Sequence, residues 1–157
     1  MPESVVVAIG VFDGVHRGHR VLLDAAKDIA VRSGTQLVVA SFDPHPAAVL
    51  RPDSFAGLLT TPERRTQLLL EVGADRVEML RFDDDLRAMS PEDFVEHVLV
   101  EREHAHAVVV GENFRFGHQA AGTIDTLRTL GETRGIDVYA VGLAGDAGAD
   151  SGNSWSS

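Results

Sequence analysis

Two histidines, His16 and His19, stand three residues apart, directly after an apolar run at residues 5–9 that is typical of a buried strand. If a helix begins near His16, both imidazoles point the same way, because residues i and i+3 share a helix face. Gly10 and Gly14 bracket the loop before them and would let the backbone approach a ligand closely. A strand that leads into a helix N-terminus offers backbone N–H groups and a favourable helix dipole to an anion. The spacing therefore predicts a phosphate site.

The helix that would carry these histidines is predicted from its apolar spacing. Its stripe repeats every 3.6 residues, and Gly34 is a good stop signal. The residues of the stripe are Val21, Leu22, Ala25, Ala26, Ile29 and Ala30.

Later segments repeat this alternation of strand and helix. Apolar runs predict strands at residues 36–42, 76–82, 107–111 and 137–141. Helices are predicted from Thr60, which has capping-box spacing to Glu63, from Ser90 as N-cap before Pro91, and around Leu127. This order predicts the α/β class, with a Rossmann-like parallel sheet of about five strands and helices on both faces. The Asp83-Asp84-Asp85 run is interpreted as a solvated face rather than a metal cluster.

Composition limits the function. The 157 residues carry a net charge of −10, which argues against a nucleic-acid partner or an anionic membrane surface. The chain contains no cysteine, which excludes thiol chemistry, and no apolar stretch approaches the length of a membrane span. A cytoplasmic location is the expectation. A phosphate site in so acidic a chain has to be locally electropositive.

Polar residues follow three of the predicted strands, in loops at residues 10–19, 43–46 and 111–117. Ligands of parallel sheets bind outside the carboxyl ends of the strands, so we expect these loops to converge. Each polar residue would, taken singly, also suit an ordinary turn or an exposed surface. Together they favour one site, made of Asp13, His16, His19, His45, Asn113 and Arg115.

At these residues the chain resembles a known family. His16-Arg17-Gly18-His19 is similar to the His-x-Gly-His signature of the nucleotidylyltransferase superfamily. The longer string from Gly10 to His16 resembles the FMN adenylyltransferase (FAD synthetase) module of prokaryotic bifunctional riboflavin kinase/FMN adenylyltransferases. Residues 41–46 and 110–117 resemble that family's Phe-x-Pro-His-Pro and Val-Gly-x-Asn-Phe-x-Phe-Gly segments.

The resemblance implies the nucleotidylyltransferase fold and transfer of AMP from ATP to FMN, which gives FAD and pyrophosphate. The implied catalytic residues are His16, His19 and Asn113. The implied ATP-binding residues are Gly10, Val11, Phe12, Asp13, Gly14, His16, Gly18 and His19. The implied FMN-positioning residues are Phe42, Pro44, His45, Asn113, Phe114, Arg115 and Phe116. No metal ligand among the protein's own residues is implied, because Mg²⁺ would be held mainly by the substrate phosphates.

The end of the chain departs from the family pattern. Residues 1–142 are expected to form the adenylyltransferase domain, and residues 143–157 a flexible tail rich in Gly, Ala, Asp and Ser. The family continues with a Ser-Ser-Thr-x-x-Arg segment and a riboflavin kinase domain, of which only Ser156-Ser157 resemble the beginning. We therefore expect a truncated chain with weakened turnover. Two alternatives stay open, namely a nucleotide- or flavin-binding module without turnover and another adenylyltransferase of the same superfamily.

Overall fold

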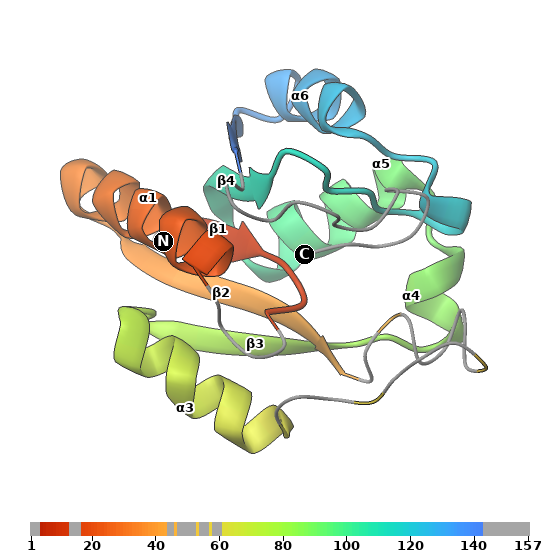
Figure 1. Cartoon of the computed structure of the whole chain (residues 1–157). Helices are drawn as coiled ribbons and strands as arrows, with labels where there is room; N and C mark the ends of the chain where they lie inside the picture. The colour runs from red at the N-terminus through yellow and green to blue at the C-terminus, as the bar shows by residue number, and fades with distance from the viewer. Residues whose placement is uncertain are drawn as a thin grey trace.

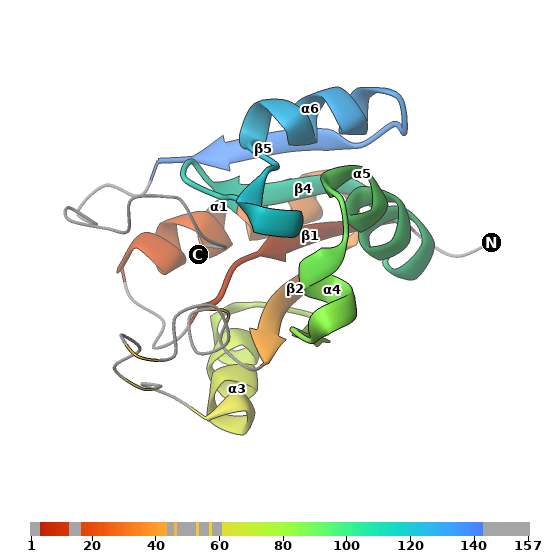
Figure 2. The same cartoon turned by 90° about the vertical axis from the view of Figure 1, so that its right-hand side faces the viewer.

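The protein is a five-stranded parallel sheet with helices on both faces, which confirms the predicted fold class (Figure 1). The computed structural model describes residues 4–12, 17–43, 46, 53, 57 and 61–142. The strands are β1 (Val5–Ile9), β2 (Gln36–Asp43), β3 (Arg76–Arg81), β4 (Ala105–Gly111) and β5 (Asp137–Val141). Their order across the sheet is β3-β2-β1-β4-β5, and β5, β4, β1 and β2 follow one another from the top in Figure 2.

The alternating residues of the strands divide the core into two layers. Val6 and Ala8 of β1 pack with α1 (Arg17–Ser33) and α3 (Pro62–Val72) on one face. Val7 and Ile9 point to the other face. That face is covered by α4 (Asp84–Ala88), α5 (Pro91–Phe94), the π-helix η1 (Val95–Arg102) and α6 (Ile124–Glu132). A short 3₁₀ turn, η2 (His118–Ala120), lies between β4 and α6.

Most of the predicted element boundaries are confirmed. The first helix ends at Ser33, with Gly34 in the left-handed region at φ 69°. The last strand spans the predicted residues 137–141. Ser90 caps α5 by accepting a hydrogen bond from the backbone N–H of Asp93, as predicted.

The predicted capping box at Thr60 and Glu63 is wrong by one residue. The N-cap of α3 is Thr61, whose Oγ1 accepts a hydrogen bond of 3.1 Å from the backbone N–H of Arg64. Pro62 explains the shift, because a proline fits the first helical position and so puts the cap at the residue directly before it.

The acidic run at residues 83–85 has a local role that its interpretation as a solvated face missed. Asp83 is the N-cap of α4, and its carboxylate accepts a hydrogen bond of 2.9 Å from the backbone N–H of Leu86. Asp84 and Asp85 occupy the first turn, where the helix dipole favours negative charge. The run starts a short helix that the apolar spacing did not predict.

The strand order defines where a ligand would bind. From β1 the chain runs outward through β2 and β3, then crosses over to β4 and β5 on the other side. The carboxyl ends of β1 and β4 therefore flank the point where the order reverses. Open parallel sheets bind their ligands in the crevice at this point.

Candidate functional site

The turn after β1 is shaped by the close approach of Gly10 and Phe12. Gly10 donates its backbone N–H to the carbonyl of Ala40 at 3.1 Å, which ties the end of β1 to β2. Phe12 is buried and has a positive φ of 54°. A methyl carbon built on Gly10 would lie 2.8 Å from Cζ of Phe12. The missing side chain of Gly10 thus leaves room for the Phe12 ring.

His19 lies in the first turn of α1, beside this aromatic ring. The side chain is 2% exposed, and its ring meets that of Phe12 edge to face, with centroids 5.1 Å apart and planes at 79°. Gly18 also lies in this first helical turn. The predicted start of the helix and the place of His19 at the carboxyl end of β1 are therefore confirmed. Its catalytic role stays a prediction, as do the roles of Asp13, Gly14 and His16, which lie outside the described residues.

The end of β2 joins the same region through a buried cation that the sequence reasoning missed. Arg65 of α3 is 0% exposed, and its Nη1 donates to Ser41 Oγ at 3.1 Å and to the carbonyl of Phe42 at 2.8 Å. Ser41 Oγ in turn donates to the carbonyl of Val11 at 2.5 Å. A signal was present in the sequence, since Arg65 precedes Leu69 by four residues on the apolar stripe of its helix.

The third predicted loop follows β4. Asn113 is exposed in the turn directly after Gly111, whereas Phe114 and Phe116 are buried and stack with centroids 5.5 Å apart and planes at 13°. Phe116 pairs with Gly122 through backbone hydrogen bonds of 3.1 and 2.8 Å. These bonds close the loop and hold it at the end of the strand.

Arg115, on the same loop, is turned back onto its own segment. Its Nε donates to the carbonyl of Ala120 at 3.1 Å, and the side chain is half-buried. In this state the guanidinium helps to close the loop. The predicted contact of Arg115 with substrate stays untested.

The structure thus gathers the described part of the predicted site at one edge of the sheet. The turn after β1, the first turn of α1, the end of β2 and the loop after β4 all lie at the carboxyl ends of parallel strands. Pro44 and His45, which follow β2 in the sequence, lie outside the described residues. Among the residues that are described, no group of three or more His, Cys, Asp or Glu side chains could hold a metal ion.

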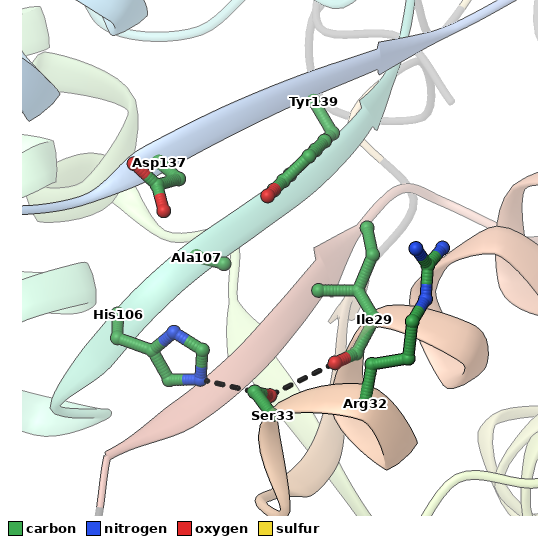
Figure 3. A pocket seen from close by; sticks show the side chains of 7 residues that line it. All are labelled: Ile29, Arg32, Ser33, His106, Ala107, Asp137 and Tyr139. Carbon is green, nitrogen blue, oxygen red and sulfur yellow. Dashed lines mark hydrogen bonds between the residues drawn. The ribbon is translucent and has the colours of Figure 1, made fainter.

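A pocket of about 330 Å³ lies at the opposite edge, at the amino ends of β4 and β5 (Figure 3). His106 projects into it, and its Nε2 lies 3.1 Å from Thr35 Oγ1 and 3.5 Å from Ser33 Oγ. The other lining residues are Ile29, Arg32, Ala107, Asp137 and Tyr139. No predicted site residue belongs to it, so the two edges of the sheet are distinct.

No helix within the described segments is long and apolar enough to cross a membrane.

Relatives of this chain carry a common name. It is 33% identical over 136 residues to the bifunctional riboflavin kinase/FMN adenylyltransferase of Escherichia coli strain K12, covering 87% of this chain and 44% of that protein. The proteins of the same name from Listeria monocytogenes and Bacillus subtilis are 35% and 34% identical, over 82% and 78% of this chain and 41% and 39% of their own lengths. The chain therefore spans less than half the length of these relatives.

Two solved structures share the fold. A protein from Streptococcus pneumoniae named a macrolide-efflux protein superposes with a TM-score of 0.77 at 26% identity, over 90% of this chain and 46% of that one. A lipopolysaccharide core biosynthesis protein from Thermoplasma volcanium GSS1 gives a TM-score of 0.56 at 20% identity, over 90% and 96% of the two chains, and shows the fold alone. Residues 1–152 match the family described as FAD synthetase. With this match and the relatives above, the predicted family is confirmed, and the chain belongs to the FAD synthetase family.

Proposed function

We propose that this chain transfers AMP from ATP to FMN, giving FAD and pyrophosphate. The observation that supports this most is the β1–α1 unit, in which buried His19 packs on Phe12 at the start of a helix that follows the central strand. This is where a sheet of this order favours phosphate. Membership of the FAD synthetase family gives the reaction class.

The chain's own residues would position the two substrates and stabilise the negative charge that develops on their phosphates. A phosphate oxygen of FMN attacks the α-phosphorus of ATP, the bond from that phosphorus to the bridging oxygen breaks, and pyrophosphate leaves. No covalent protein intermediate is needed. Negative charge grows on the phosphate oxygens during this step. His16, His19 and the N–H groups at the start of α1 would stabilise it.

Magnesium fits this site as an ion held by the substrates. The described residues contain no cluster of three or more His, Cys, Asp or Glu side chains, while Asp43 is half-buried at the carboxyl end of β2. Mg²⁺ prefers phosphate oxygens, waters and one or two carboxylates. Held by ATP, it would supply charge neutralisation on the phosphates. Asn113, exposed at the end of β4, would contact the substrates near them.

The flavin would bind beside the aromatic residues on the α5 side of the edge. Phe42, Phe94, Phe114 and Phe116 pack in one layer there, and the Phe94 and Phe116 rings lie 5.4 Å apart. All four are buried, so direct contact of the flavin with Phe42, Phe114 or Phe116 requires this layer to open, whereas Asn113 is already exposed. We assign the adenylyltransferase domain to residues 1–142.

The test is a panel of phosphate acceptors with ATP labelled at the α-phosphate. FMN, phosphopantetheine and nicotinate mononucleotide are each incubated with the protein and Mg²⁺, and the adenylylated products are separated. We expect label in FAD only, with one pyrophosphate released for each FAD. Label in another product would assign a different adenylyltransferase. Nucleotide binding without any labelled product would favour the alternative that the chain is a binding module without turnover.

A further inference from the structure

A buried arginine connects the ends of β1 and β2, two adjacent strands that lead into the site. The guanidinium of Arg65 reaches from α3 to the end of β2, where its Nη1 donates to Ser41 Oγ and to the Phe42 carbonyl. Ser41 Oγ carries the connection to the Val11 carbonyl after β1. Arg65 is among the largest fully buried side chains of the described residues, and Ser41 is also 0% exposed. We call this chain of hydrogen bonds the Arg65 brace.

The brace lies at the carboxyl edge and is separate from the hydrogen bonds that build the sheet. β1 and β2 are already paired in parallel register from Val5 opposite Gln36 to Ile9 opposite Ala40. The brace begins just where that pairing stops, at Val11, Ser41 and Phe42. Burying a guanidinium is costly compared with an apolar side chain of similar volume. Sheet pairing alone therefore does not explain why an arginine occupies this position.

Beyond the brace, both strands continue directly into predicted site residues. Phe12 precedes Asp13, Gly14 and His16, and Asp43 precedes Pro44 and His45. The backbone positions that the brace holds therefore lie directly before both segments in the sequence. Misplacement of a reacting group by about 1 Å can cost on the order of 10²-fold in rate. A fork-shaped, permanently charged donor is suited to fixing two acceptors at once.

We propose that Arg65 is a positioning residue for adenylyl transfer, acting through Ser41 to hold the β1 and β2 ends in their reactive arrangement. The inference rests on the proposed function and adds a residue to it. Arg65 is fully buried, so it acts through the backbone of these two ends rather than by touching a substrate. Its nearest sequence neighbour, Arg64, instead lies at the surface and bonds Gln67 at 2.9 Å.

The test compares Ser41→Ala, Arg65→Met, Arg65→Lys and the control Arg64→Met in the full-length gene product. FAD formation is measured for kcat and for KM of ATP and FMN, together with Tm and amide hydrogen exchange. Ser41→Ala is the decisive variant, because it keeps the Arg65 charge and removes the link to Val11, while Tm shows whether the fold is kept. We expect its kcat to fall about tenfold or more, with each KM changed less than about threefold.

Arg65→Lys should restore part of the rate lost in Arg65→Met, since Lys keeps charge and donors but is shorter. Arg64→Met should match wild type. In Ser41→Ala, exchange should accelerate at residues 10–12 and 42–43 and stay unchanged in β4 and β5. An unchanged kcat in Ser41→Ala would overturn the proposal, and so would acceleration spread evenly over the whole sheet. If the wild type forms no FAD, the proposed function fails, while the exchange pattern alone still supports or overturns the brace.

Discussion

At the scale of single residues, the site depends on how side chains pack behind the predicted ligand-binding loop. Gly10 was expected to let backbone approach a ligand, and in the structure its bare Cα faces the Phe12 ring. Phe12 in turn contacts His19. A substitution at Gly10 that moves the Phe12 ring therefore also moves the surface on which His19 packs, although Gly10 and His19 are nine residues apart in the sequence.

Gly10→Ala should lower both stability and activity. The added methyl would overlap the Phe12 ring at 2.8 Å, and overpacking of this kind costs about 1–3 kcal/mol. The ring should shift against His19 and reduce FAD formation. Gly10→Ala/Phe12→Leu, which makes room for the methyl, should recover part of the lost stability in thermal melting, as expected for residues in contact. Strictly additive losses in the double variant would contradict this packing.

The two predicted histidines should affect the chemical step more than binding. Losing one transition-state donor typically costs ~10²–10³-fold in rate, so His16→Ala and His19→Ala should lower kcat far more than ATP affinity. His97→Ala is the matched control, because His97 is exposed on η1 and pairs with Glu101 instead. Wild-type turnover in both His16→Ala and His19→Ala would remove them from the phosphate site.

At the scale of elements, strands and long helices could be predicted because their apolar residues repeat at a fixed period. Two kinds of feature were missed, namely local capping at helix starts and contacts between residues far apart in the sequence. The start of α3 shifted from Thr60 to Thr61 because Pro62 fixes the first turn. The Asp83 cap creates a helix too short to show a period. The position of Arg65 on an apolar stripe could have indicated that it is buried, but its acceptors on β2 are known only from the structure.

The loop after β4 should depend strongly on Gly122. A methyl on this glycine would lie 2.7 Å from the Phe116 ring, which stacks on Phe114 and lies near Phe94. Gly122→Ala should therefore destabilise the protein by about 1–3 kcal/mol in denaturant unfolding. The exposed Asn113 should become more mobile in the same variant, seen as faster amide exchange. Unchanged stability would show that the aromatic pair adapts freely.

The π-helix η1 carries a titrating pair on its surface. The side-chain hydrogen bond from His97 to Glu101, 3.0 Å long, raises the pKa of His97 above its ordinary value of 6.5. Protonated His97 therefore stabilises the folded state through Glu101. This contribution to the free energy of unfolding is fully present below pH 6.5 and is lost as the pH rises through the higher pKa of the folded protein. An NMR titration of His97 should show the raised midpoint, and Glu101→Gln should lower it. Equal midpoints in the two proteins would contradict the contact.

At the scale of the whole molecule, the proposed function requires an acidic domain to bind polyphosphate. The chain carries a net charge of −10, so local positive potential must come from N–H groups at the start of α1 and from cations such as Arg65 near the carboxyl edge. The sequence predicted the parallel sheet and this edge, because three loops with polar residues follow strands. The buried connections between the loops could not be predicted, since they join residues far apart in sequence.

Nucleotide should stabilise the fold through its phosphates. At a concentration 100-fold above its Kd, ATP with Mg²⁺ should add about 2.7 kcal/mol, which is roughly 5–10 °C in Tm. Adenosine at the same concentration should give a much smaller shift, because it lacks the charge that the helix start attracts. Equal shifts with ATP and adenosine would show that the phosphates are not recognised.

The central claim is that substrates bind at the carboxyl edge of β1, β2 and β4. The most direct measurement is an amide NMR titration of the protein with ATP and Mg²⁺. We predict the largest shift changes at residues 10–12, 17–19, 42–43 and 111–114, with residues 29–33 and 106–107 around the pocket of Figure 3 unchanged. Changes concentrated at residues 29–33 and 106–107 instead would place the nucleotide at the opposite edge and contradict the account.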